Sequence, residues 1–147
     1  MQVFLILATM IFLHLFADYQ LQGVLARMKQ RRWWQSNVPK SADEAPDQSK
    51  YDNDYKAALL AHSFEWAFLM MLPLLHDIYY KVWDFERESV VAVVAYAALL
   101  ALNTAQHSII DHLKANRRTI NLVEDQVLHL AQVVATWCLF YGATWRP

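Results

Sequence analysis

Histidine and aspartate recur four residues apart at three places in this chain. Residues four apart lie on one face of a helix, about 6 Å from each other. Each pair would therefore present an imidazole and a carboxylate in the same direction, and these groups are common ligands of zinc, manganese and iron. The spacing predicts a metal site if the fold brings the pairs together. The pairs are His14 with Asp18, His107 with Asp111, and Asp125 with His129.

The apolar segment at about 57–76, which contains none of these pairs, adds His62 and, three residues later, Glu65. Four histidines and three aspartates exceed what one tetrahedral ion needs. They fit either two divalent ions (Zn, Mn or Fe) or one ion whose histidines are oriented by the remaining carboxylates. Glu65 is the candidate general base, because a carboxylate beside a metal site can accept a proton. The predicted metal ligands are His14, Asp18, His62, His107, Asp111, Asp125 and His129.

Two other interpretations of these residues stay open. Histidine and aspartate could bond to each other between helices, at about 1 kcal/mol per hydrogen bond. They could also form a proton relay, as intramembrane ionisable groups do in transporters. Asn103, Gln106 and Gln132 are interpreted as groups that pack beside the cluster or hydrogen-bond to it.

The elements that must position these residues are four long apolar segments, at about 3–25, 57–76, 89–112 and 122–144. Each is long enough to cross a hydrocarbon core of about 30 Å at about 1.5 Å per residue. A soluble helical bundle is disfavoured, since its helices would show a polar face at every turn. We expect an all-α membrane protein in which residues 1–147 form one domain of four transmembrane helices in a bundle.

Composition excludes several other classes of protein. The net charge is −1, so the basic footprint of a dedicated nucleic-acid binder is missing. Two glycines and four prolines are too few for a phosphate-binding glycine loop or a β-sandwich. The single Cys138 permits neither an internal disulfide nor a cysteine-based zinc knuckle. No nucleotide, haem or flavin motif is visible.

Basic residues predict the orientation in the membrane. Seven lysines and arginines lie in the polar stretch 27–56 and three more between 114 and 118, against three on the other side. The positive-inside rule then places the loop 27–56 in the cytoplasm and both termini outside it. At this orientation all the candidate ligands lie in the cytoplasmic half of the bilayer.

The basic and tryptophan-rich run 27–34 is interpreted as an interfacial anchor, with anionic lipid or nucleic acid as the alternative contact. Residues 37–54 are expected to be a mobile loop.

Three motifs together resemble a known family. The runs His14–Gln22, His107–Lys114 and Asp125–His129 look like the H-x-x-A-D-F-x-L-Q, H-x-x-x-D-x-x-K and D-Q-x-x-H elements of the bacterial domain-of-unknown-function family 3307. Tyr19 stands where phenylalanine is usual, the pattern around Glu65 is loose, and the polar insert falls outside the resemblance. The resemblance implies a small integral protein of the bacterial inner membrane and implies no particular reaction.

The leading hypothesis is a metal-dependent hydrolase that acts on a lipid or on a substrate embedded in the membrane. The first alternative is a non-enzymatic interaction protein with a structural metal or a His/Asp hydrogen-bond network. The second is a small proton-coupled transporter. Membrane lipids are the expected partners. Small residues between Ala92 and Ala101 leave a homo-oligomer open, and the loop 27–56 leaves a protein partner open.

Overall fold

Four long helices make up the body of the protein. The structure, a computed structural model, describes residues 2–37, 51–83 and 88–144, so most of the predicted mobile loop lies outside the described residues. The described part contains helices and turns and no strand. The long helices are α1 (Gln2–Phe16), α4 (Asp54–Trp83), α5 (Glu88–His112) and α6 (Leu122–Thr144), and two short helices, α2 (Leu25–Met28) and α3 (Arg31–Asn37), lie between α1 and α4.

Four helical segments, each built on one of the long helices, are long and apolar enough to cross a membrane: Gln2–Leu21, Asp54–Tyr79, Val90–Arg117 and Leu122–Thr144. They pack together, which confirms the predicted all-α bundle and supports a multi-pass membrane protein. Large apolar side chains point away from the bundle on every one of them, for example Phe12, Val94 and Val127. Such a surface suits contact with lipid rather than with water.

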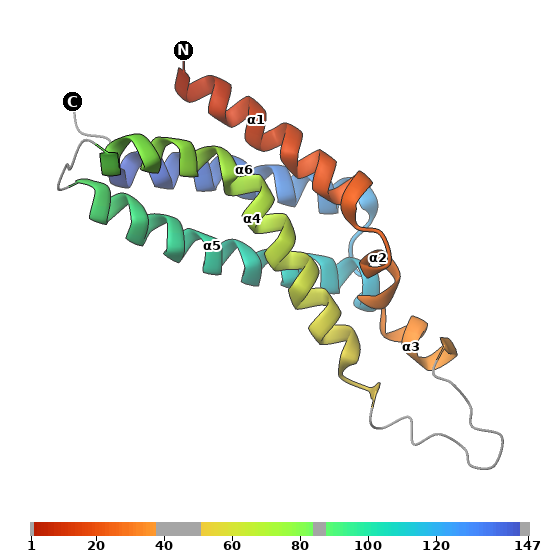
Figure 1. Ribbon diagram of the computed structural model, residues 1–147. Coiled ribbons are helices and arrows are strands. Elements are labelled where there is room, and N and C mark those ends of the chain that lie inside the picture. The colour runs from red at the N-terminus through yellow and green to blue at the C-terminus, as the bar shows by residue number, and fades with distance from the viewer. Residues whose placement is uncertain (1, 38–50, 84–87, 145–147) are drawn as a thin grey trace.

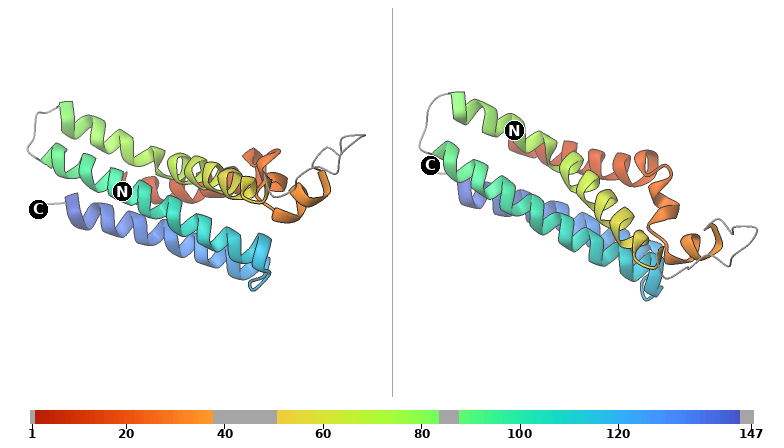
Figure 2. Two further views of the ribbon diagram at one scale, coloured as in Figure 1. Left: turned by 90° about the horizontal axis from the view of Figure 1, so that it is seen from below. Right: turned by 60° about the horizontal axis from the view of Figure 1, so that its bottom comes forward.

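The helices form a closed ring of neighbours. α4 packs against α1 and α5, and α6 packs against α5 and α1. Successive long helices run in opposite directions, so α1 begins at the end of the bundle where α6 ends (Figure 1). The two further views show the same four helices packed together, with α2 at one end of the bundle and α3 projecting beyond it (Figure 2). This topology places the end of α1, the start of α4, the end of α5 and the start of α6 together.

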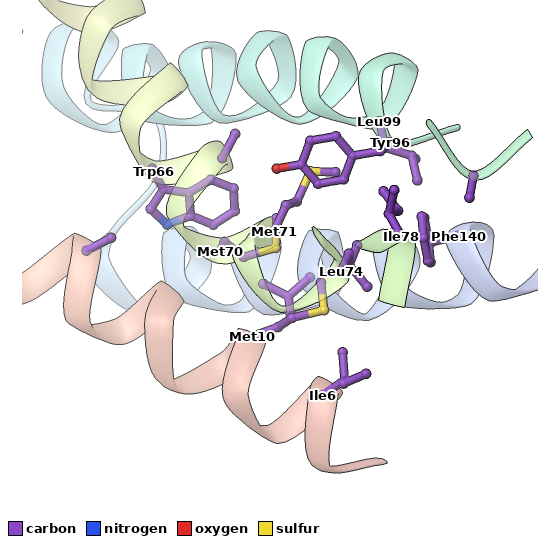
Figure 3. Packing of buried hydrophobic residues seen from close by; sticks show 14 residues of the cluster. Ile6, Met10, Trp66, Met70, Met71, Leu74, Ile78, Tyr96, Leu99 and Phe140 are labelled. Carbon is purple, nitrogen blue, oxygen red and sulfur yellow. The ribbon is translucent and has the colours of Figure 1, made fainter. Parts of the chain in front are cut away.

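An apolar cluster fills the bundle between these helices. Figure 3 shows Ile6 and Met10 of α1 facing Met70, Met71 and Leu74 of α4. Trp66 lies at one end of the cluster, and Ile78 and Phe140 lie at the other. Because Trp66 is fully buried, its indole closes the apolar core on the side where the histidines begin.

α4 bends part-way along its length (Figure 1). Pro73 lies inside this helix, where a proline removes one backbone hydrogen bond and its ring clashes with the carbonyl of the preceding turn.

A polar network joins α5 and α6 at a similar depth: Asn103 donates to Thr136 Oγ1 at 2.8 Å, and Gln132 donates to Asn103 Oδ1 at 2.8 Å. These two amides therefore link helices, whereas the side chain of Gln106 is exposed.

Local sequence signals set the helix ends that carry the candidate ligands. α6 begins with a capping box: Asn121 Oδ1 accepts from the backbone N–H groups of Val123 and Glu124, and Glu124 accepts from the N–H of Asn121. Asp125 consequently sits in the first turn of the helix. α1 and α5 each widen into a π-helical turn at their far end, η1 (Ala17–Leu21) and η3 (Leu113–Arg117). Such turns recur at functional sites.

The first span ends earlier than the predicted boundary at residue 25. The helix stops at Leu21, and Gly23 follows with a φ of +48°. This left-handed conformation suits glycine and costs other residues about 1–2 kcal/mol. The chain turns there and starts α2, so the basic stretch that follows is folded back along α4.

Replacing Gly23 by alanine is expected to lower the free energy of unfolding by about 1 kcal/mol through backbone strain. The added Cβ would lie 3.7 Å from the nearest atom, the carbonyl oxygen of Leu21, so no steric clash contributes. Gly142→Ala is the matched control, because Gly142 lies within α6 with open space around it and alanine favours a helix by about 1 kcal/mol. In unfolding measurements in mixed detergent micelles, Gly23→Ala should lower the free energy of unfolding and Gly142→Ala should raise it. A change of the same sign in both variants would contradict the role given to Gly23.

Candidate metal centre

Six of the seven predicted ligands come together at one end of the bundle. They form three overlapping groups, and within each group one ligand atom per residue lies within 4.8 Å of the others. All six are buried, and they come from η1, α4, α5 and α6. The groups are Asp18 with His62 and His107, His107 with Asp111 and His129, and Asp18 with Asp125 and His129.

Two histidines and one aspartate make the tightest set of donor atoms. His62 Nε2 lies 3.3 Å from His107 Nε2 and 3.3 Å from Asp111 Oδ2, and His107 Nε2 lies 3.6 Å from the same oxygen. Ligands about 2.1 Å from an ion are about 3.4 Å apart in a tetrahedral site. Neighbouring ligands of an octahedral ion at the same distance would be about 3.0 Å apart. The three edges therefore match one face of a tetrahedron. We name these residues the ligand triangle.

The second carboxylate oxygen of Asp111 lies near a second set of atoms that could ligate a metal. His129 Nε2 lies 3.8 Å from Asp111 Oδ1 and 3.5 Å from Asp125 Oδ1. Within the described residues, His129 Nε2 and Asp125 Oδ1 are buried without a hydrogen-bond partner. Buried polar atoms are normally paired, and a cation near these atoms would satisfy them. The donor set therefore fits a metal ion, and Asp111 could bridge two positions.

Two lysines reach the aspartates of the cluster. Lys29 Nζ lies 2.6 Å from Asp111 Oδ2, and Lys114 Nζ lies 2.5 Å from Asp125 Oδ2. The side chain of Lys29 is 9% exposed, so this lysine belongs to the interior of the protein. Membrane anchoring, predicted for the whole run 27–34, does not describe it. The turn at Gly23 is the reason, since it directs α2 back toward the bundle.

The charges around the cluster limit how many ions it can hold. With neutral histidines, three carboxylates (Asp18, Asp111 and Asp125) face two ammonium groups, which leaves one net negative charge. One divalent cation would turn this into one net positive charge. Two would leave three positive charges in a buried space, a costly arrangement without further anions. The ion pairs therefore favour a single ion for as long as both lysines stay in place.

Trp66 holds two of the histidine rings. Its Nε1–H donates to His14 Nδ1 at 3.0 Å, and its ring stacks on His107 with centroids 4.1 Å apart. Because Nδ1 of His14 accepts this hydrogen bond, a neutral His14 carries its proton on Nε2. That atom is buried and has no hydrogen-bond partner among the described residues. His14 is therefore arranged as a hydrogen-bond donor beside the cluster, and it belongs to none of the three groups.

Two glutamines orient the carboxylate of Asp18. Gln126 donates to Asp18 Oδ2 at 2.7 Å and to Asp125 Oδ2 at 3.1 Å, and Gln22 donates to Asp18 Oδ1 at 3.0 Å. Groups that hydrogen-bond to ligands in this way fix their direction. Gln126 thereby ties the end of the first span to the start of the fourth.

The pattern of spacings did not identify every residue of the centre. Trp66 could have been found, because it follows His62 by four residues and shares its helix face. Lys29 has no local signal that separates it from the neighbouring basic residues. Glu65, the candidate general base, is half-buried and lies outside the three groups, so its role stays a prediction. The two other histidines lie apart, with His76 exposed and His112 beside a surface pocket.

The chain matches no family model, no curated protein and no solved structure. The centre comprises the ligand triangle, the second oxygen of Asp111 beside His129, and the Nε2 atom of His14, which has no hydrogen-bond partner among the described residues. It also contains one buried ion pair, Lys29–Asp111, and one partly exposed pair, Lys114–Asp125.

Proposed function

We propose that the protein holds one zinc ion on the ligand triangle and acts as a metal-dependent hydrolase of a membrane lipid. The observation that carries this proposal is the convergence of His62 Nε2, His107 Nε2 and Asp111 Oδ2 with separations of 3.3–3.6 Å. Catalytic zinc sites commonly use three protein ligands and leave the fourth position to water or substrate. The tetrahedral spacing favours zinc over manganese or iron, which prefer more ligands at closer angles.

The ion, when bound, would supply a Lewis acid and activate a water molecule for attack. Around it, the chain provides groups for the remaining steps. The ammonium of Lys29, beside Asp111, would stabilise negative charge that develops on the substrate. The Nε2–H of His14 would donate a hydrogen bond to an oxygen of the substrate.

Proton acceptance needs a carboxylate that is free to take a proton. Glu65 is the candidate from the sequence. Asp125 is less suited, because Lys114 Nζ lies 2.5 Å from its Oδ2 and His129 Nε2 lies 3.5 Å from its Oδ1. Hydrolysis consumes one water. Its oxygen would bond to the attacked acyl or phosphoryl centre, the bond between that centre and the leaving oxygen would break, and one proton of the water would pass through the carboxylate to the leaving oxygen. No other co-reactant is needed.

The proposed substrate and location follow from the position of the centre. The six clustered ligands lie within helices that are long and apolar enough to cross a membrane, so lipids are the molecules nearest to it. Both the resemblance to family 3307 and the basic loops support a bacterial inner membrane with the centre on the cytoplasmic side. Association into a homo-oligomer would bury more of the polar surface at this end of the bundle.

A structural metal is the second candidate function, and one observation favours it. The side chains of His107, Asp111 and His129 are at most 2% exposed. A fully enclosed ion with four protein ligands serves stability rather than turnover. In that case the protein would bind a partner and hydrolyse no lipid.

The experiment compares zinc-loaded with zinc-free protein in mixed micelles of detergent and glycerophospholipid. The lipid products are identified by mass spectrometry. Turnover should depend on zinc and fall more than about 100-fold in Asp111→Asn, which keeps the shape but weakens the ligand. Asp77→Asn is the matched control, because Asp77 bonds to Tyr141 at the other end of the bundle and should retain full activity. Zinc bound at one equivalent without turnover of any phospholipid would select the structural role.

A further inference from the structure

A second polar feature lies just beyond the metal centre, at the same end of the bundle. It is a pocket of about 370 Å³ between α3, the start of α4 and the end of α5 with η3. Pockets of about 300–1,000 Å³ are typical of small-molecule sites. Its lining includes Arg31, Arg32, Tyr55, His112, Asn116 and Arg117. We name it the arginine pocket.

The arginine pocket gathers positive charge. Among the described residues that line it are three arginines and one histidine, and no carboxylate. Arg31 is already paired, because its guanidinium lies 3.6 Å from the exposed carboxylate of Asp52, which is not among the lining residues. Neither Arg32 nor Arg117 forms a salt bridge with any carboxylate of the described residues. Two guanidinium groups thus remain for an anion.

The walls of the pocket are held in place by specific contacts. Asn116 donates to the backbone carbonyl of Lys29 at 3.0 Å, and its Oδ1 accepts from the backbone N–H of Arg31 at 2.8 Å. The rings of Tyr55 and His112 stack with centroids 6.1 Å apart. These contacts join α3 to η3 and α4 to α5, so the arginines are carried on a connected frame.

The same contacts connect the pocket to the metal centre. Lys29, whose carbonyl is bound by Asn116, places its ammonium on Asp111 of the ligand triangle. His112, in the pocket wall, directly follows Asp111 in the chain. Along a helix, His112 lies about 7.5 Å beyond His107. A molecule anchored in the pocket would therefore extend to the centre over roughly the length of a lipid headgroup.

We propose that the arginine pocket binds the phosphate group of the substrate. Guanidinium groups match phosphate oxygens in pairs of hydrogen bonds, and basic pockets between membrane helices bind the headgroups of anionic lipids. The pocket lies where the third span ends, at Arg117, so we expect it at about the level of the lipid phosphates. This inference rests on the proposed hydrolase, and it names its substrate class as lipids that carry a phosphate.

The test measures binding by calorimetry to zinc-free protein in detergent, so that no metal takes part. The probes are dioctanoyl phosphatidate, dioctanoylglycerol and inorganic phosphate. Arg32→Gln with Arg117→Gln should weaken phosphatidate binding at least about tenfold through lost charge-assisted hydrogen bonds. The control is Arg27→Gln with Arg118→Gln, which removes the same charge from two exposed arginines outside the pocket and should change binding less than about threefold by screened charge alone.

Each outcome bears on the proposal. Binding of phosphatidate together with weak binding of dioctanoylglycerol supports a phosphate pocket, and inorganic phosphate that competes fully would identify a soluble phosphate compound as its source. Equal binding of dioctanoylglycerol, or equal losses in the two double variants, would overturn the proposal. Zinc content is measured in parallel. If the protein binds phosphatidate but holds no zinc, the phosphate pocket stands and the hydrolase is overturned. If it holds zinc but binds no phosphatidate, the phosphate pocket is overturned and the zinc site stands.

Discussion

Replacing His107 by alanine and Asp111 by asparagine is expected to abolish zinc binding. Wild-type protein purified in mild detergent without chelator should contain about one equivalent of zinc, because the lysine–aspartate pairs at the cluster favour a single ion. The double variant loses two of three atoms of the ligand triangle. Its affinity should fall by more than about 100-fold, because losing a group that merely orients a ligand already costs about 10- to 100-fold.

Mass spectrometry of the metal content checks this expectation. His76→Ala with Asp77→Asn is the matched control, since it removes one imidazole and one carboxylate that lie 3.8 Å apart at the other end of α4. It should retain the zinc. His107 is buried against Trp66, so a cavity could unfold the double variant. The single Asp111→Asn variant therefore accompanies it, and monodisperse Asp111→Asn protein with full zinc content would contradict the site.

Lys29→Met is expected to destabilise the zinc-free protein by about 3–5 kcal/mol. Removing one partner of a buried ion pair leaves the other charge uncompensated, and this is the typical cost. Lys29 and Asp111 are 9% and 2% exposed at their side chains, so water can replace little of the lost contact. Methionine keeps the length and the apolar stem of the lysine, which limits the effect of packing.

Zinc should reverse most of this loss, because the cation supplies the positive charge that Asp111 has lost. The measurement is the unfolding of wild type and Lys29→Met with and without saturating zinc. Lys114→Met is the comparison: its side chain is 33% exposed, so the zinc-free loss should be clearly smaller. Arg27→Met, at an exposed position nearby, should change little. A Lys29→Met loss that zinc leaves unchanged would mean that the ion does not bind at Asp111.

Much of the fold could be predicted from the order of residues. Four apolar segments predict four spanning helices, because a polypeptide in lipid must satisfy its hydrogen bonds within each segment. The H-x-x-x-D and D-x-x-x-H spacings place histidine and aspartate on shared faces, since helical geometry is local. The antiparallel order of the helices then places those faces at one end. Asn121 and Glu124 even determine where the fourth span begins, through a capping box.

Other features depend on contacts between residues far apart in the chain. Lys29 stands among similar basic residues, and only the turn at Gly23 and the bonds of Asn116 bring its ammonium to Asp111, 82 positions later. Trp66 shares a helix face with His62, yet its hydrogen bond to His14 depends on how α1 lies against α4. The arginine pocket likewise combines three separate stretches of the chain.

The sequence by itself determined the helices, their order and the set of histidines and aspartates at one end. The tertiary structure decided which atoms meet: Nε2 of His62 and His107 at one oxygen of Asp111, Nε2 of His129 near the other, and Nε2–H of His14 as a donor. The physical reason is the range of the forces. Periodicity and capping act within one or two turns, whereas ring orientation and ion pairing depend on the packing of whole helices.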